Sequence, residues 1–265
     1  MNKTSLFILV LSVLALSVSC KSKYQLLLEG NDVETKYSTA FELFNAGKYE
    51  KAAKLFESLA VVTPGTSRDD TVQYYWALSN YRFQDYFTAE ANFRSFCEHF
   101  PRSPFTSDAQ FLRIDCLFRD TNRYELDQTP TYKAVTEISE YMIENPTSTH
   151  FSTCEQMLVT LGERLDKKAF EAARLYYNME DYQAATVAFR NILKDDPENV
   201  YREDVLYYTA MSSYKFALLS VAAKQKERYL VFQDDYYNFI SEYPDSRYRQ
   251  TLDPLFNRVK KLENK

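Results

Sequence analysis

The sequence predicts an all-α protein built from repeated helical hairpins, and three observations support this fold class. Glycine is scarce, at 4 of 265 residues, and proline totals only 8, whereas an antiparallel β protein of this length needs many more turn residues. Hydrophobic residues make up 45% of the chain, which is enough for a sizeable core. The third observation is a short pattern with helical spacing that recurs along the chain.

The first copy of this pattern follows the Gly47-Lys48 turn. Aromatic, small and aliphatic side chains share one helical face there, namely Tyr49, Ala52, Phe56 and Leu59. Pro64 then ends the unit. A small residue is needed where two closely packed helices cross, because a branched side chain does not fit at the crossing.

The same positions recur in four further units. They are Tyr86, Ala89, Phe93, Phe96 and Pro101; then Ala134, Ile138, Tyr141 and Pro146; then Tyr182, Ala185, Phe189, Ile192 and Pro197; and, in a degenerate fifth unit, Phe232 at the small position with Tyr236, Phe239 and Pro244. The pattern resembles the tetratricopeptide repeat (TPR), which implies a TPR-type α-solenoid of about five helix-turn-helix repeats. The closing prolines lie further apart than the ideal period of about 34 residues. We therefore expect lengthened helices and an insertion at residues 120–130.

The N-terminal residues have the features of an export signal. Lys3 precedes an apolar run from Leu6 to Leu16, which is shorter than the roughly 20 residues of a membrane-spanning helix. The run ends in Leu-Ser-Val-Ser-Cys at residues 16–20, and this resembles a bacterial lipobox, in which Cys20 would carry the acyl chains. Lys21 then favours the outer membrane. The alternative is an ordinary secretory signal with an incidental cysteine.

The sequence thus predicts four regions. Residues 1–19 are the signal peptide, residues 20–32 a lipidated tether, residues 33–146 the N-terminal repeats and residues 147–265 the C-terminal repeats.

No pattern in the sequence indicates catalysis or a metal or cofactor site. The two histidines, His99 and His150, lack partners at the spacing of a metal site or catalytic triad. Acidic pairs at residues 69–70, 195–196 and 234–235 are interpreted as solvated helix ends. Cys97, Cys116 and Cys154 are expected to be buried thiols, with a Cys97–Cys116 disulfide as the alternative. A net charge of −5 gives no nucleic-acid footprint.

Several stretches resemble BamD, the TPR lipoprotein family of the outer-membrane β-barrel assembly machinery. One is Asp-Gln-Thr-Pro at residues 127–130, followed by a helix that ends in Pro-Thr-Ser at residues 146–148. Another is Leu-Gly-Glu-Arg-Leu-Asp at residues 161–166, which continues to Ala-Ala-Arg-Leu-Tyr-Tyr at residues 172–177. A third is Pro64-Gly65 with Val72-Gln73. The long C-terminal helices and the weak fifth repeat depart from the family pattern.

This resemblance implies a scaffold on the periplasmic face of the outer membrane, with no cofactor. Its C-terminal repeats would dock a BamA-like barrel protein, with Arg202 as a contact. Its N-terminal repeats would receive unfolded outer-membrane proteins. The residues expected to line that groove are Tyr37, Phe41, Phe44, Asn45, Tyr74, Leu78, Tyr81 and Arg82. A TPR lipoprotein of pilus or envelope biogenesis is the alternative, whereas a single Trp argues against a carbohydrate-capturing one.

Overall fold

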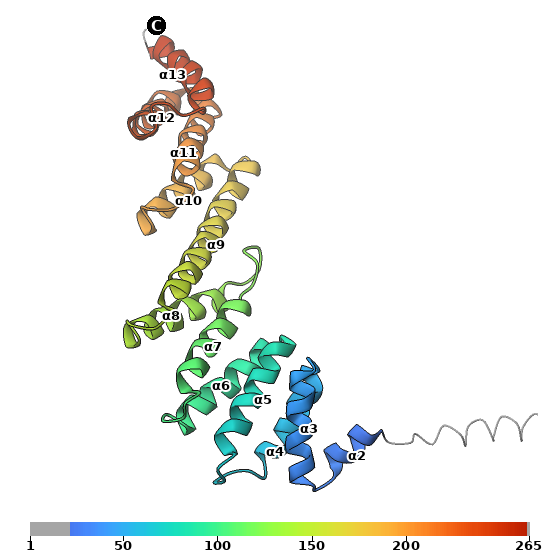
Figure 1. Ribbon diagram of the computed structural model, residues 1–265. Coiled ribbons are helices and arrows are strands. Elements are labelled where there is room, and N and C mark those ends of the chain that lie inside the picture. The colour runs from blue at the N-terminus through green and yellow to red at the C-terminus, as the bar shows by residue number, and fades with distance from the viewer. Residues whose placement is uncertain (1–21, 264–265) are drawn as a thin grey trace, which may run out of the picture. The chain divides into compact units, whose positions relative to one another are not determined.

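The computed structural model describes residues 22–263, and every regular element in that range is an α-helix (Figure 1). In chain order the helices are α2 (Lys23–Glu29), α3 (Val33–Asn45), α4 (Tyr49–Ala60), α5 (Asp69–Phe83), α6 (Tyr86–His99), α7 (Thr106–Arg119), α8 (Thr129–Glu144), α9 (Phe151–Asn178), α10 (Tyr182–Asp195), α11 (Arg202–Leu218), α12 (Ala222–Glu242) and α13 (Arg249–Glu263).

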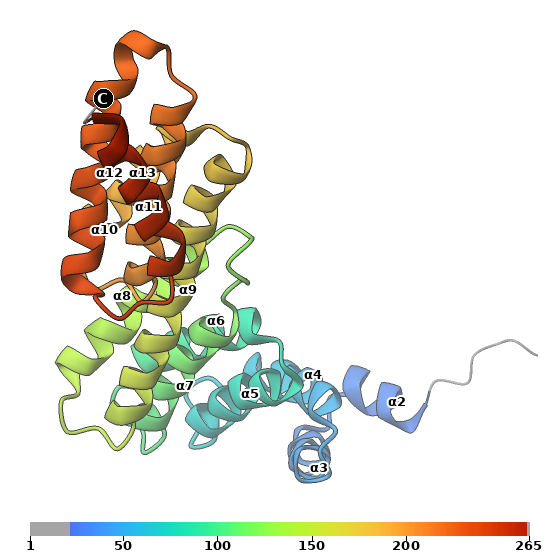
Figure 2. The same ribbon diagram turned by 90° about the horizontal axis from the view of Figure 1, so that it is seen from above.

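Helices that follow one another in the chain pack against one another. From α3 to α7, and again from α8 to α13, each helix contacts its successor (Figure 2). Packing between sequence neighbours is the pattern of a repeat solenoid. The predicted fold class, an all-α TPR-type solenoid, is therefore confirmed for the described part of the chain.

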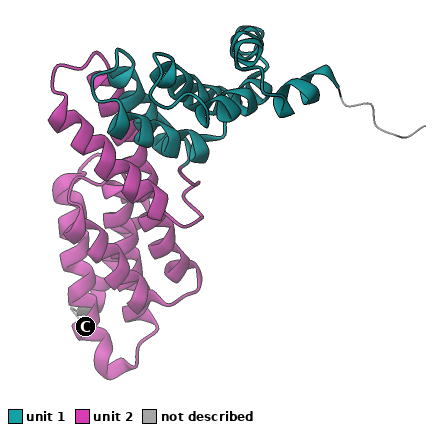
Figure 3. Cartoon of the chain, turned by 90° about the horizontal axis from the view of Figure 1, so that it is seen from below, with its two compact units in different colours: residues 1–120 teal, residues 121–265 magenta. Residues whose placement is uncertain are grey.

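The chain forms two compact units, which meet in sequence between Asp120 and Thr121 (Figure 3). We call residues 22–120 the N-terminal unit and residues 121–263 the C-terminal unit. The predicted division at 146/147, after the third repeat, separates sets of repeats and stays a prediction. The compact units divide earlier because α9 is 28 residues long and packs on both α8 and α10. It thereby joins the second helix of the third repeat to the fourth repeat.

The helix crossings confirm the predicted small positions. Ala52, Ala89, Ala134 and Ala185 are fully buried. The aromatic or aliphatic residues four positions later are fully buried too, at Phe56, Phe93, Ile138 and Phe189. In the degenerate fifth repeat Phe232 is also fully buried, and its ring packs on Tyr214 with the centroids 5.2 Å apart.

The turn inside three of the repeats has the same left-handed backbone at its centre. Gly47 has φ +72°, and Gln84 and Glu180 have φ 70° and 63°. Glycine adopts this backbone conformation without strain, whereas a residue with a Cβ atom is strained in it. The two repeats without glycine compensate with an N-cap: Asp85 accepts from the Thr88 N–H at 3.1 Å, and Asp181 accepts from the Ala184 N–H at 3.0 Å. Lys48, at the start of α4, provides no side-chain cap.

An aromatic residue just after the closing proline connects successive repeats. Phe105 stacks on Tyr74 with centroids 4.5 Å apart, Tyr201 on Phe170 at 4.9 Å, and Tyr248 on Tyr207 at 4.0 Å. Arg68 takes this place after the first repeat and lies 4.6 Å from the Tyr37 ring. The helical spacing did not predict this aromatic position, although the aromatic residue follows each of these prolines by four residues.

Part of the predicted tether is helical. Helix α2 begins at a Ser22 N-cap, and Tyr24, Leu27 and Leu28 share one face by i, i+3, i+4 spacing and pack on the first repeat. The Tyr24 hydroxyl also donates to the Lys51 carbonyl at 3.0 Å. The part of residues 20–32 that the structure describes is therefore docked rather than extended.

The predicted insertion is a loop between α7 and α8. Two basic side chains of α9 hold it: Arg164 donates to the Asn122 carbonyl at 3.1 Å, and Lys168 donates to the carbonyls of Tyr124 and Leu126 at 3.1 and 2.7 Å.

Candidate protein-binding sites

The groove residues expected on α3 lie within the packing of the first repeat. Phe41 and Phe44 each contact the ring of Tyr75, with centroids 4.7 and 5.2 Å apart. Tyr37 is half-buried beneath the Arg68 guanidinium. Asn45 is exposed at the end of α3. Aromatic edges are thus available on α3, but most of each ring is used for packing.

Tyr74 requires a correction, because it is buried and does not present its ring to a ligand. It stacks on Phe105 and its hydroxyl donates to Asp108, so it joins the second repeat to the third. Burial, followed by the hydrogen bond to Asp108, raises the pKa of Tyr74 above its ordinary value. The helical spacing of α5 did not show how closely α7 covers the face that carries Tyr74.

The two remaining aromatic or aliphatic groove candidates on α5 are partly covered. Leu78 is half-buried against the same cluster as Tyr74. The Tyr81 hydroxyl donates to the buried Asp115 at 2.5 Å. Burial and this bond raise the pKa of Tyr81 to about 12.

Arg82 is exposed and lies in a cavity of about 520 Å³ between the turns of the first two repeats. The cavity is lined by Gly47, Lys48, Tyr49, Glu50, Lys51, Arg82, Phe83 and Gln84. Glu50, its one acidic residue, is paired with Lys54 at 2.7 Å. The side chain of Phe83 is 48% exposed. Three cations beside open aromatic surface suit a ligand that carries a carboxylate and an aromatic ring.

We call this place the Arg82 cavity. Sequence reasoning found Arg82 but not Lys48, Lys51 or Phe83. Those residues come from the turns and the start of α4, whereas helical spacing points only to the faces of the first helices. The Gly47-Lys48 turn was the indication that could have led to them.

Arg202 in the C-terminal unit forms a bidentate pair with Glu242 of α12. Its Nε donates to Oε2 at 2.7 Å and its Nη2 donates to Oε1 at 2.8 Å, while Nη1 donates to the Pro197 carbonyl at 2.7 Å. The hydrogen bond from Arg202 lowers the pKa of Glu242. Arg202 therefore links the fourth repeat to the fifth, with its guanidinium partly exposed.

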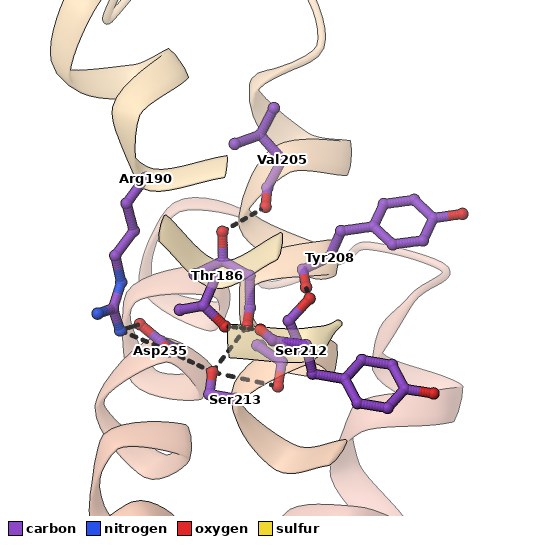
Figure 4. Close-up of polar contacts among 10 residues, drawn as sticks. Thr186, Arg190, Val205, Tyr208, Ser212, Ser213 and Asp235 are labelled. Carbon is purple, nitrogen blue, oxygen red and sulfur yellow. Dashed lines mark hydrogen bonds and ion pairs between the residues drawn. The ribbon is translucent and has the colours of Figure 1, made fainter. Parts of the chain in front are cut away.

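A buried polar network connects three helices of the same unit (Figure 4). Arg190 of α10 donates to both carboxylate oxygens of Asp235 on α12, at 2.7 and 2.9 Å, and Ser213 of α11 also donates to that carboxylate. The expectation that residues 234–235 form a solvated helix end is wrong for Asp235. This residue lies in the middle of α12 and is buried, because α12 continues beyond it to Glu242.

Among the described residues, Cys97, Cys116 and Cys154 form no disulfide, and the latter two are fully buried. Burial raises the pKa of the Cys97 thiol to about 11. Within residues 22–263 no group of His, Cys, Asp and Glu side chains is arranged to hold a metal ion, and no helix has the length and apolarity to cross a bilayer. Cys20, the predicted lipidation site, lies outside the described residues.

The helix packing and these sites define a TPR-type repeat protein whose exposed polar and aromatic residues suit protein ligands. A family model described as "Outer membrane lipoprotein" (YfiO) matches residues 30–230. The chain belongs to this YfiO outer membrane lipoprotein family.

No curated protein shows significant similarity to the chain. Among solved structures, the chain is similar to the TPR2AB-domain:pHSP90-complex of yeast Sti1. The TM-score is 0.38 at 13% identity, over 86% of this chain and 98% of that one. The repeat fold itself rests on the helix packing described above.

Proposed function

We propose that the protein is a lipid-anchored scaffold of outer-membrane β-barrel assembly, which binds a BamA-like barrel protein and unfolded outer-membrane protein clients. The observation that carries this proposal is membership of an outer membrane lipoprotein family, whose model matches residues 30–230, from the first repeat into the fifth. Repeat solenoids offer extended surfaces for other proteins. The work of the protein is then recognition and positioning, without bond chemistry. Cys20 would carry the acyl chains, on the periplasmic face of the outer membrane.

The experiment that tests the proposal is affinity purification of the chain from outer membranes under mild detergent. Recovery of a BamA-like barrel protein is the expected result. Recovery of pilus or other envelope-biogenesis components in its place would overturn the proposal and favour the alternative. Acylation is checked separately by mass spectrometry, in which Cys20→Ala removes the lipid mass.

The Arg82 cavity is the proposed place for the client's C-terminal segment. A barrel strand that ends in an aromatic residue and a carboxylate would place its ring against Phe83 and its carboxylate near the three cations. Tyr37 and Asn45 would extend the contact along α3.

Arg82→Gln combined with Phe83→Ala should weaken binding of such a peptide at least about tenfold, the loss expected for a charged hydrogen bond and an apolar contact. Phe87→Ala is the matched control, because Phe87 is 76% exposed on the next helix and does not line the cavity. Equal peptide affinity in the double variant and the control would remove the cavity from the proposal.

Arg202 is the proposed docking contact for the barrel protein, and its pair with Glu242 permits a sharp test. Arg202→Ala should reduce recovery of the barrel protein. Glu242→Ala frees the guanidinium without removing it, and should leave recovery equal or higher. If both variants reduce recovery alike, the pair supports the shape of the C-terminal repeats and does not itself contact the partner.

A further inference from the structure

The turn between α11 and α12 exposes apolar side chains that no neighbouring helix covers. Leu219 is 69% exposed and Val221 is 71% exposed, and Leu218 lies beside them at the edge of the same patch. Residues 217–223 contain no charged side chain. Exposed apolar side chains gathered in one patch indicate an interaction surface.

The backbone of this turn is held by bonds within the turn itself. The Gln225 side-chain amide donates to the carbonyls of Leu218 and Ser220, both at 3.1 Å. The Leu219 N–H donates to the Lys215 carbonyl at 3.1 Å. Entry into an apolar medium is costly for unpaired backbone groups. The carbonyls of Leu218 and Ser220 and the Leu219 N–H are already paired, so these three groups add no such cost when the turn presents its side chains outward.

Arg228 of α12 connects the turn to the last residues of α11. The Arg228 guanidinium donates to the Ser220 hydroxyl and lies 3.9 Å from the centroid of the Phe216 ring. The Ser220 hydroxyl in turn donates to the Phe216 carbonyl. The apolar tip is therefore an ordered feature of the fold.

Basic residues flank the apolar tip in the sequence. Residues 215–228 contain Lys215, Lys224, Lys226 and Arg228 against one acidic residue, Glu227, which pairs with Lys224 at 3.2 Å. The chain as a whole carries a net charge of −5, so the net charge of this segment is opposite in sign to that of the chain. Lysine stems can lie along an apolar surface while their ammonium groups reach anionic headgroups.

We propose that the α11–α12 turn is a reversible contact site for an anionic lipid surface. Leu219 and Val221 enter the boundary between headgroups and acyl chains, and Lys224 and Lys226 pair with the lipid phosphates. Charge complementarity favours lipid as the occupant, and membership of an outer membrane lipoprotein family places a bilayer within reach of the molecule. This contact is distinct from the lipid anchor and from the docking of a barrel protein.

The test uses the acylated full chain, purified from membranes and reconstituted into vesicles. Trp76 is the only tryptophan, so Trp76→Phe with Leu219→Trp places a single fluorophore on the turn. Trp76→Phe with Phe87→Trp is the matched control on an exposed site of α6. The vesicles contain acyl-brominated phosphatidylcholine, with or without phosphatidylglycerol.

We expect bromine quenching of the residue-219 fluorophore in vesicles with phosphatidylglycerol, and little quenching at residue 87. Lys224→Gln with Lys226→Gln should lower the ratio of lipid-bound to free turn roughly tenfold, while circular dichroism stays unchanged. A residue-219 fluorophore that stays unquenched in both vesicle types would overturn the proposal.

A protein occupant gives a different result. If the two lysine substitutions remove the recovery of a barrel protein from outer membranes and leave quenching unchanged, the turn is a protein-docking surface and the lipid proposal fails. If the two lysine substitutions reduce quenching while the barrel protein is still recovered, the turn binds lipid and the docking of the barrel protein does not depend on that contact. Failure of the assembly proposal alone would leave the quenching result intact.

Discussion

The two units place a buried carboxylate between different helices of successive repeats. In the N-terminal unit the buried carboxylate of Asp115 on α7 accepts from Tyr81, a residue 34 positions earlier on α5. In the C-terminal unit the buried carboxylate of Asp235 on α12 accepts from Arg190, 45 positions earlier on α10. The Tyr81–Asp115 bond connects α5 and α7, which are the first helices of their repeats. The Arg190–Asp235 pair connects α10 and α12, which are the second helices of theirs.

This difference shows what the repeat period controls. Contacts between residues 34 apart recur where successive first helices keep a regular offset, as in Glu34 with Arg68 and the Asp166 carboxylate with the Val200 N–H. Helix α12, at 21 residues, is longer than its counterparts. The Arg190–Asp235 and Asp204–Tyr248 contacts, which connect successive repeats at this end of the chain, span 45 and 44 residues instead. The C-terminal unit therefore has the same repeat fold, but side chains at different sequence offsets come into contact in it.

The largest expected effect comes from the equivalent core residues of the two units. Phe93→Ala and Phe189→Ala each empty a fully buried site and should lower the free energy of unfolding by about 3–5 kcal/mol. Chemical denaturation measures the loss. Phe87→Ala and Val187→Ala are matched controls in the same helices, because both side chains are mostly exposed. Losses as large in the controls would contradict the shared core position.

Two buried thiols show which unit opens in these variants. Cys116 belongs to the N-terminal unit and Cys154 to the C-terminal unit. Because helices pack chiefly with sequence neighbours, Phe93→Ala should accelerate labelling of Cys116 more than of Cys154, and Phe189→Ala should do the reverse. Equal acceleration of both thiols would mean that the units open together.

The next effect concerns the buried ion pair. Arg190→Met leaves the Asp235 carboxylate buried without its cation and should cost about 2 kcal/mol, which is less than for a fully buried pair because Arg190 is 49% exposed. The double variant Arg190→Met with Asp235→Leu should recover part of that loss. Denaturation of both variants and the parent checks this, and a double variant no more stable than Arg190→Met would refute the argument.

A smaller effect is expected in the N-terminal unit. Tyr81→Phe and Tyr74→Phe each remove one hydroxyl that donates to a carboxylate. The cost should approach about 1.5 kcal/mol for Tyr81, since its acceptor Asp115 is buried, and stay near 0.5 kcal/mol for Tyr74, since Asp108 is exposed and can be hydrated. Thermal or chemical denaturation gives the order, and the reverse order would show that acceptor burial does not decide it.

The smallest effect depends on pH. Glu242→Gln should cost about 0.2–1 kcal/mol at pH 7, because the pair with Arg202 is partly exposed. The pKa of Glu242 is lowered from its ordinary value of 4.5, so the folded protein holds this carboxylate ionised. The stability it contributes is complete above that value and is lost as pH falls through the lowered pKa. The parent and the variant should therefore converge in acid, and a gap that persists there would exclude the ion pair as its cause.

The sequence predicted the fold well because small residues, aromatics and prolines at fixed spacing leave little choice of packing. Ala52, Ala89 and Phe93 lie where the pattern puts them. The sites were harder to predict, since helical spacing does not show how far a neighbouring helix covers a face. Tyr74 was expected to line the groove, and it is buried against Phe105. The Arg82 cavity and the apolar tip both lie at turns, where periodicity gives no information.

The packing of each helix on its sequence neighbours also bears on how the chain folds. Nearly all tertiary contacts are between elements adjacent in sequence, so little loop entropy must be lost before a contact forms. A chain that emerges N-terminus first can complete the α3–α4 pair, and then the α5–α6 pair on top of it, before the later repeats are present. This order allows each finished repeat to serve as the template for the next.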